Sequence, residues 1–255
     1  MELVFSIFCF GVVFLFGIVI GSFLNVCIFR IPEGTSISTP RSHCMSCGYV
    51  LKWYDLIPLF SYLILKGRCR ECGAKVSVQY PIVEALNGVM YVVVFLANGF
   101  NLTSGLYCMV TSALIVITVI DWRTFEIPLP LNCFIFFIGI LHLFLDWYHW
   151  INYLIGFFSI SVILWALFRL SNGSAIGGGD VRLMASAGIL IGWQKIIAAF
   201  LLGCILGSVI HLLRMKFAGA GRRLAMGPYL SVGIFLSMLW GEYIINWYLG
   251  LCGVR

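Results

Sequence analysis

Two aspartates occupy positions where an ionisable side chain is costly. Asp121 closes one apolar segment, and Asp180 ends the run Gly177-Gly178-Gly179-Asp180 at the start of another. A carboxylate within hydrocarbon costs roughly 2.5 to 3.5 kcal/mol on insertion scales, so one that persists usually faces a polar cavity or a partner. Two carboxyls that lie close together share one proton, which leaves one as a base and the other as an acid. The residues therefore indicate an acid/base pair at a membrane.

An acid/base pair of this kind suits an aspartic protease. The ionised member takes a proton from water as the water attacks a peptide carbonyl, and the protonated member donates to the developing gem-diol oxygen. The glycines before Asp180 let an extended peptide approach without a Cβ clash. Paired membrane acids also carry protons or cations in transporters, although the two halves of this chain show no inverted repeat. The residues favour the protease and leave open a transporter and a scaffold for an assembly machine.

Four cysteines form the pairs Cys44-Met45-Ser46-Cys47 and Cys69-Arg70-Glu71-Cys72. Two thiolates separated by two residues grip one metal from a tight knuckle, and a second knuckle completes the tetrahedral shell of a structural zinc site. Gly48 and Gly73 follow the two pairs, where knuckle turns need positive φ. We predict a structural zinc ion bound by Cys44, Cys47, Cys69 and Cys72, with a redox pair or solvated thiols as the alternative.

Glu84 is an unusual acid, one turn inside an apolar segment that Pro81 opens. It either favours the positive end of a helix, pairs with an arginine of the cysteine loop, or lines a polar binding site. Small and amide residues share one helix face between Gly21 and Arg30, which indicates helix packing ahead of a substrate contact. The sequence has no HExxH motif, no serine nucleophile arrangement and no nucleotide-binding loop.

The elements that position these residues are membrane helices. The chain of 255 residues is 62% hydrophobic and only 10% charged. Several apolar runs approach or exceed the ~20 residues that a bilayer helix needs. Eight apolar segments are expected, near residues 3–29, 82–98, 103–121, 131–147, 151–169, 180–193, 195–214 and 227–250. Gly192, Trp193 and Gln194 indicate a tight turn between the sixth and seventh segments, although a single re-entrant hairpin remains an alternative there.

Basic residues give the orientation, because loops rich in Lys and Arg stay in the cytoplasm. One side of the predicted topology carries Arg30, Arg41, Lys52, Lys66, Arg68, Arg70, Lys75, Arg123, Arg169, Arg182, Arg214, Lys216, Arg222 and Arg223. The opposite side carries only Lys195 and Arg255. Both termini are therefore expected outside, and Asp121 and Asp180 at the cytoplasmic face. The net charge of +6 reflects this topology, and no nucleic-acid partner is expected.

These observations predict an all-α fold, a polytopic membrane helix bundle of about eight transmembrane helices with a cytoplasmic zinc-binding loop domain. Residues 1–29 form the first transmembrane helix, residues 30–80 the cytoplasmic loop domain with four cysteines, and residues 81–255 the transmembrane core with the aspartate pair.

Several motifs, in this order, resemble the bacterial type IV prepilin peptidases, the bifunctional leader peptidase and N-methyltransferase group of GxGD aspartic proteases. Besides the paired cysteines, the motifs are Gly21-Ser22-Phe23-Leu24-Asn25-Val26, Asp55-Leu56-Ile57-Pro58, Gly67-Arg68-Cys69-Arg70, Tyr80-Pro81-Ile82-Val83-Glu84, Ile120-Asp121 with Ile127-Pro128, Gly177-Gly178-Gly179-Asp180-Val181 and Gly227-Pro228. The match spans nearly the whole chain. Met45, Leu129, Arg182, Met226 and Tyr229 depart from common family residues, and none of them belongs to the proposed aspartate pair.

The resemblance implies a multi-pass protein of the bacterial inner (cytoplasmic) membrane whose active site faces the cytoplasm. Its substrates would be type IV prepilin or pseudopilin precursors of pilus, secretion or competence systems, whose short basic leader is cut after a glycine. Asp121 and Asp180 would be the catalytic residues. The resemblance also implies methylation of the new N-terminal amine with S-adenosylmethionine as donor, by residues 30–80, with Glu84 as a candidate contact of the donor. Membrane lipid would surround the core.

Overall fold

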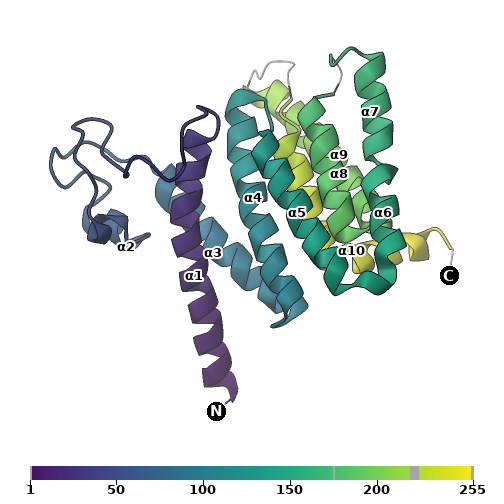
Figure 1. Ribbon diagram of the computed structural model, residues 1–255, viewed down its shortest axis with the longest axis horizontal. Helices are drawn as coiled ribbons and strands as arrows, with labels where there is room; N and C mark the ends of the chain where they lie inside the picture. The colour runs from purple at the N-terminus through teal and green to yellow at the C-terminus, as the bar shows by residue number, and fades with distance from the viewer. Residues whose placement is uncertain (1, 175, 219–223, 254–255) are drawn as a thin grey trace. The chain divides into compact units, whose positions relative to one another are not determined.

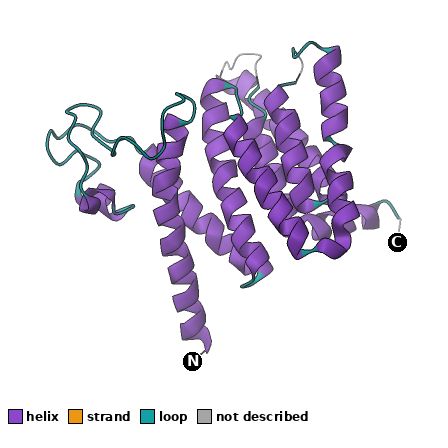
Figure 2. Ribbon diagram, viewed as in Figure 1, coloured by secondary structure: helices purple, strands orange, loops and turns teal. Residues whose placement is uncertain are grey.

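The chain is built from helices (Figures 1 and 2). The structure is a computed structural model that describes residues 2–174, 176–218 and 224–253. Within those ranges there is no strand, and only two isolated β-bridges occur, both in the cysteine loop. The expected all-α class is therefore confirmed. Arg222, Arg223 and Arg255, which contributed to the predicted orientation, lie outside the described residues.

Each of the eight predicted apolar segments is helical. The helices are α1 Glu2–Arg30, α3 Gln79–Asn98, α4 Leu102–Thr124, α5 Leu129–Leu145, α6 Trp150–Ser159, α7 Ser161–Leu170, α8 Gly178–Ile191, α9 Trp193–Ala218 and α10 Gly227–Leu251, with the short helices η1 Trp53–Leu56, α2 Phe60–Ile64 and η2 Trp147–His149. Among the described residues, six spans are long and apolar enough to cross a membrane, and one of them, Trp147–Leu170, joins η2, α6 and α7. This indicates a multi-pass membrane protein. The count of eight is not confirmed, because α5 has 17 residues and α8 only 14.

The chain divides into two compact units, residues 1–99 and 100–255. In the first unit, α1 packs against α3, and the cysteine loop connects them. A Cβ on Gly17 would lie only 2.7 Å from the Gly88 Cα, so glycine allows the two backbones to approach closely. The Asn87 side chain donates to the Gly17 carbonyl at 2.7 Å across this contact.

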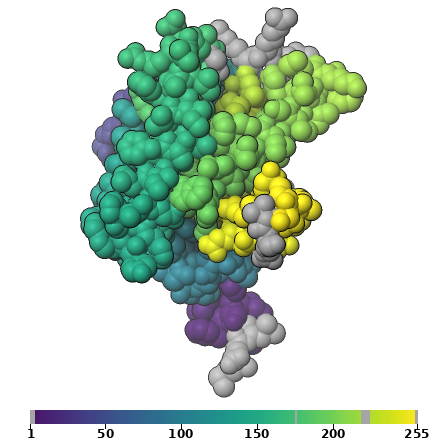
Figure 3. All heavy atoms as spheres, turned by 90° about the vertical axis from the view of Figure 1, so that its right-hand side faces the viewer, coloured from purple at the N-terminus to yellow at the C-terminus, as the bar shows by residue number. Residues whose placement is uncertain are grey.

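The second unit is arranged around α4, most of which is buried. Helix α10 packs against α4 and α9, while α5 and α6 pack against α8 (Figure 1). The α6–α8 contact depends on glycine, because a Cβ on Gly156 would overlap the Gly188 carbonyl oxygen. Figure 3 shows the face formed by α6, α7, α9 and the last turns of α10. Exposed apolar side chains such as Phe158, Ile163 and Ile205 cover these helices, as expected for a surface in lipid.

The ends of the helices place the aspartates. Helix α4 ends at Thr124, and the next residue, Phe125, turns the chain with a φ of 57° and donates its N–H to the Asp121 carbonyl at 2.9 Å. Pro128 precedes α5, since its fixed φ suits the entry to a helix. Gly192, with φ of 82°, ends α8 directly before α9 begins at Trp193. The predicted tight turn at this point is confirmed.

Candidate active site and metal cluster

Asp121 lies near the end of α4 and is 4% exposed. Its Oδ2 accepts a hydrogen bond from the Gly227 N–H at 2.8 Å, at the first residue of α10. The first N–H groups of a helix have no partner within the helix and carry partial positive charge, which suits a carboxylate. A Cβ on Gly227 would lie 2.7 Å from the same oxygen, so this position requires glycine. The start of α10 therefore fixes the Asp121 carboxyl.

Asp180 is the third residue of α8, and the run of glycines before it forms the start of that helix. The Gly177 N–H donates to the Asp180 carboxyl, so the acid caps its own helix in the manner of the second half of a capping box. A Cβ on Gly179 would lie 2.8 Å from the Ile127 Cβ. The glycines therefore let the start of α8 lie directly against the segment that follows α4.

The two aspartates belong to the same unit, and their charges interact. They come from different helices, but Ile127, six residues after Asp121, contacts Gly179, the neighbour of Asp180. Two carboxyls in one poorly hydrated place hold a proton jointly, so one is a base while the other is an acid. The arrangement can perform general acid/base chemistry on a substrate that reaches both carboxyls.

Two further residues near the pair have no role that their sequence motifs predict. One is Gly227, which belongs to the motif Gly227-Pro228. The other is Asn132, which is 2% exposed on α5, and neither of its amide atoms has a partner within the described part of the chain. Asn132 shares a helix face with Gly139, which contacts α8 at Ile189, so Asn132 lies beside the first turns of α8. Its only sequence signal is an amide inside an apolar segment.

The four predicted ligand cysteines converge. The sulfur atoms of Cys44, Cys47, Cys69 and Cys72 all lie within 4.8 Å of one another, and Cys44 and Cys72 are 3.9 Å apart. A tetrahedral zinc ion with Zn–S bonds of about 2.3 Å requires sulfur separations of about 3.8 Å. The Ser46 and Cys47 N–H groups donate to the Cys44 sulfur, as suits a thiolate ligand. The cluster therefore fits zinc.

Both knuckles have the same backbone pattern. Cys44 N–H donates to the Tyr49 carbonyl at 2.8 Å, and Cys69 N–H donates to the Ala74 carbonyl at 2.8 Å. Gly48 and Gly73 have φ of 74° and 69°, and each donates its N–H to the first cysteine of its pair. The predicted positive φ at both glycines is confirmed.

Glu84 lies on α3 and is 6% exposed. Its Oε2 accepts a hydrogen bond from the Leu59 N–H at 2.8 Å, and the Ser22 side chain is a second partner. The carboxylate thus joins the cysteine loop to α1 and α3. A Cβ on Gly21 would lie 2.7 Å from the Glu84 Cα, and the Asn25 amide donates to the Tyr80 carbonyl at 3.2 Å. The packing interpretation of the face between Gly21 and Arg30 is confirmed at these positions.

The N-terminal and C-terminal parts of the chain each match a known protein family. Residues 15–98 match the Bacterial Peptidase A24 N-terminal domain, and residues 108–212 match the Type IV leader peptidase family. A protein of Aeromonas salmonicida named "Prepilin leader peptidase/N-methyltransferase" is 33% identical over 94% of each chain. Proteins of the same name from Pseudomonas aeruginosa and Bacillus subtilis are 28% and 29% identical over 94% of this chain and 93% and 97% of their own. No solved structure matches.

Sequence identity and coverage at this level distinguish between the protease, the transporter and the assembly scaffold, the three classes of protein that the residues alone left open. They support a peptidase and give no support to a transporter or an assembly scaffold. The chain belongs to the type IV leader peptidase family.

Proposed function

We propose that this protein is a membrane aspartic endopeptidase that removes the leader peptide from type IV prepilin or pseudopilin precursors. The cut follows a glycine on the cytoplasmic side of the bacterial inner membrane. The same chain then methylates the new N-terminal amine with S-adenosylmethionine as the donor. The observation that carries the proposal is the pair of interacting carboxyls, Asp121 and Asp180, in the part of the chain that matches the Type IV leader peptidase family. The names of the relatives include both activities.

Cleavage begins when the ionised member of the pair accepts a proton from water. The water oxygen forms a bond to the scissile carbonyl carbon, while the protonated carboxyl donates its proton to the carbonyl oxygen. The gem-diol then collapses: the C–N bond breaks as the leaving nitrogen takes a proton from one carboxyl, and a gem-diol hydroxyl returns its proton to the other carboxyl as the new C=O bond forms. The Gly227 and Gly177 N–H groups hold the carboxyls in place throughout. The pair begins the next cycle with one proton again.

The four cysteines are proposed to hold zinc as a structural ion. A four-sulfur shell has no open position, so the ion supplies folding energy to the loop and takes no part in hydrolysis. Metal removal is therefore expected to unfold the loop of residues 30–80 and to reduce methyl transfer before it affects the aspartate pair. Zinc analysis of the purified protein tests the ion directly, since one zinc per chain is expected.

S-adenosylmethionine supplies an electrophilic methyl group on a sulfonium. The free amine of the cleaved substrate forms the new N–C bond as the S–C bond breaks, and the amine then loses a proton. We assign this step to residues 30–80 and the adjoining start of α3, with Glu84 as the candidate residue that faces the donor. Its position at the junction of the loop and the helices supports the proposal.

The decisive experiment for cleavage uses membranes that contain the enzyme and a pilin precursor. Asp121→Asn and Asp180→Asn preserve size and hydrogen bonding but cannot share a proton as a carboxyl pair does, so each is expected to abolish processing. Glu126→Asn, which changes an exposed acid in the loop after α4, is the control and should process normally. If either aspartate variant processes at the parent rate, the proposed pair is wrong.

Reporter insertions test the predicted orientation of the chain in the membrane. Reporters that are active only in the cytoplasm or only outside it can be inserted after Lys75 and after Tyr148, at the two ends of the bundle in the predicted topology. A reporter after Lys75 that is active only outside the cytoplasm would reverse the proposed side of cleavage.

A further inference from the structure

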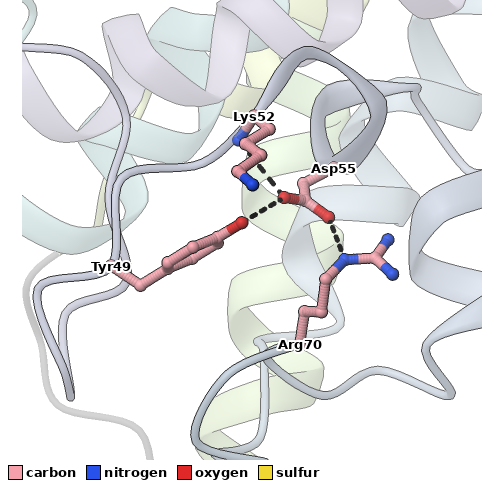
Figure 4. Close-up of polar contacts among 4 residues, drawn as sticks. All are labelled: Tyr49, Lys52, Asp55 and Arg70. Atoms are coloured by element: carbon pink, nitrogen blue, oxygen red, sulfur yellow. Dashed lines mark hydrogen bonds and ion pairs between the residues drawn. The ribbon is translucent and has the colours of Figure 1, made fainter.

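We propose that Asp55 is a positioning residue that holds the two cysteine knuckles together and thereby sets the zinc affinity of the loop. The inference rests on the proposed zinc site, but it concerns a residue that binds no metal itself. It follows from the contacts that meet at one carboxylate (Figure 4).

Three donors from different parts of the loop converge on Asp55. Arg70 Nε donates to Oδ1 at 2.7 Å, and the Lys52 N–H and the Tyr49 hydroxyl donate to Oδ2 at 3.2 Å and 3.3 Å. In Figure 4 the Tyr49 and Arg70 side chains approach the carboxylate from two separate loop segments. The Asp55 side chain is only 2% exposed in a loop that is otherwise mostly open to solvent. Although burial of the carboxyl acts in the opposite direction, the donors Arg70 and Lys52 hold the pKa of Asp55 below its usual value.

The first partner belongs to the first knuckle. Tyr49 is two residues after Cys47, and its carbonyl accepts the Cys44 N–H hydrogen bond that closes the knuckle. The same residue therefore shapes the first pair of ligands with its backbone and contacts Asp55 with its hydroxyl. A shift of Tyr49 would therefore move both the first pair of ligand cysteines and the hydrogen bond to Asp55.

The second partner belongs to the second knuckle. Arg70 lies between Cys69 and Cys72, so its backbone is part of the turn that presents both sulfurs. Its guanidinium also lies over the Tyr54 ring, 4.9 Å from the centroid, next to Asp55 in η1. The Asp55 carboxylate thus connects the two halves of the ligand set without contacting a cysteine.

The effect of the Asp55 contacts on zinc affinity depends on how strong these contacts are. An isolated surface ion pair contributes about 0 to 1 kcal/mol, which would leave zinc binding almost unchanged. Asp55 differs because it is shielded from water and accepts from two knuckles at once. Residues that orient metal ligands from outside the coordination shell typically change metal affinity about 10- to 100-fold when replaced. We therefore expect a loss in that range.

The same short segment also reaches the membrane helices. Asp55 lies in η1, and Leu59, four residues later, donates its N–H to Glu84 on α3. The segment between Asp55 and Leu59 is thus hydrogen-bonded to the cysteine knuckles at one end and to Glu84 at the other, within one unit of the chain.

The test uses the full-length protein in detergent and measures zinc stoichiometry and zinc affinity by competition with a chromogenic chelator. Asp55→Asn keeps the size of the side chain but weakens its acceptance from Arg70. We expect an affinity about 10- to 100-fold lower than that of the parent protein. Arg70→Gln removes the same contact from the other side and should lower affinity in the same direction. Glu71→Gln is the control, because it removes an exposed acid between the same two cysteines, and its affinity should stay at the parent value.

The results of these measurements distinguish a wrong role for Asp55 from a wrong zinc site. If the parent protein binds no zinc, the proposed metal site is wrong. If the parent binds one zinc and both Asp55→Asn and Arg70→Gln retain its affinity, the role of Asp55 is wrong while the site remains. An equal loss in Glu71→Gln would also overturn the inference, because the effect would then be one of net charge. If Asp55→Asn does not fold, Arg70→Gln decides alone.

Discussion

Replacing Gly227 with alanine tests the aspartate site without changing either carboxyl. The new Cβ would lie 2.7 Å from Asp121 Oδ2 and 2.9 Å from its Cγ. Carbon and oxygen atoms at rest keep about 3.5 Å, so the carboxyl must retreat by roughly 0.8 Å or turn. Asp121 is 4% exposed and has little room to do so. The hydrogen bond from the Gly227 N–H, now 2.8 Å, is then lengthened or lost.

The expected effect is on the chemical step. A misplacement of about 1 Å at a reacting group costs roughly 100-fold in rate, which corresponds to about 2.7 kcal/mol of activation free energy. Substrate contacts elsewhere are unchanged, so kcat should fall while KM remains near the parent value. The assay is cleavage of a purified pilin precursor, followed over time by the change in its size.

Gly105→Ala is the matched control for this experiment. Gly105 also lies in the second unit, within α4, but a Cβ there would meet nothing within 4 Å. This variant should cleave at the parent rate, and alanine should stabilise the helix by about 0.5 to 1 kcal/mol. Parent-like cleavage by Gly227→Ala would refute the reasoning, because it would show that the contact between α10 and Asp121 does not position the carboxyl.

Three further expectations follow from contacts at other positions. Gly179→Ala should lower kcat in the same assay, because its Cβ would lie 2.8 Å from Ile127 Cβ, whereas Gly178→Ala, with its nearest contact at 3.6 Å, should not. Glu84→Gln should lower methylation of the mature substrate, measured by mass spectrometry, and leave cleavage unchanged. The hydrogen bond from the Tyr153 hydroxyl is the main cause that lowers the pKa of Asp146. The ionised Asp146 therefore stabilises the fold fully above about pH 4, and this stabilisation is lost as the pH falls further. Asp146→Asn should remove this part of the pH dependence of thermal unfolding.

Local sequence patterns predicted the membrane helices and the cysteine cluster well. Hydropathy located helices such as α3 and α9 to within a few residues, because a bilayer span is long and uniformly apolar. The spacing of the cysteines predicted that four sulfurs converge, since each knuckle is a local turn that needs only nearby residues. Both features depend on short stretches of chain, which is why a single sequence shows them.

Features that depend on distant contacts could not be predicted in the same way. The segment 151–169 was expected as one helix, but it divides at Ile160 into α6 and α7 with neither glycine nor proline at the break. There the Ser161 hydroxyl donates to the Phe157 carbonyl, a bond that bends helices. Helix α10 bends at Trp240, where φ is −123° and ψ is 17°. Neither bend changes the apolar composition of its segment, so hydropathy did not show it.

The aspartate site shows the same limit and also why glycine matters there. Gly227 is 106 residues from Asp121 in sequence, so the hydrogen bond from its N–H could not be predicted, although the motif that contains Gly227 could be recognised. Two helix starts converge on the pair, α10 at Asp121 and α8 at Asp180. A carboxylate in hydrocarbon costs roughly 2.5 to 3.5 kcal/mol. A hydrogen bond to a charged group returns about 1.5 to 3 kcal/mol, and a helix start adds about 0.3 to 1. These terms nearly balance for one charge, whereas a second charge beside it would add repulsion, which supports the proposal that the pair holds a single shared proton.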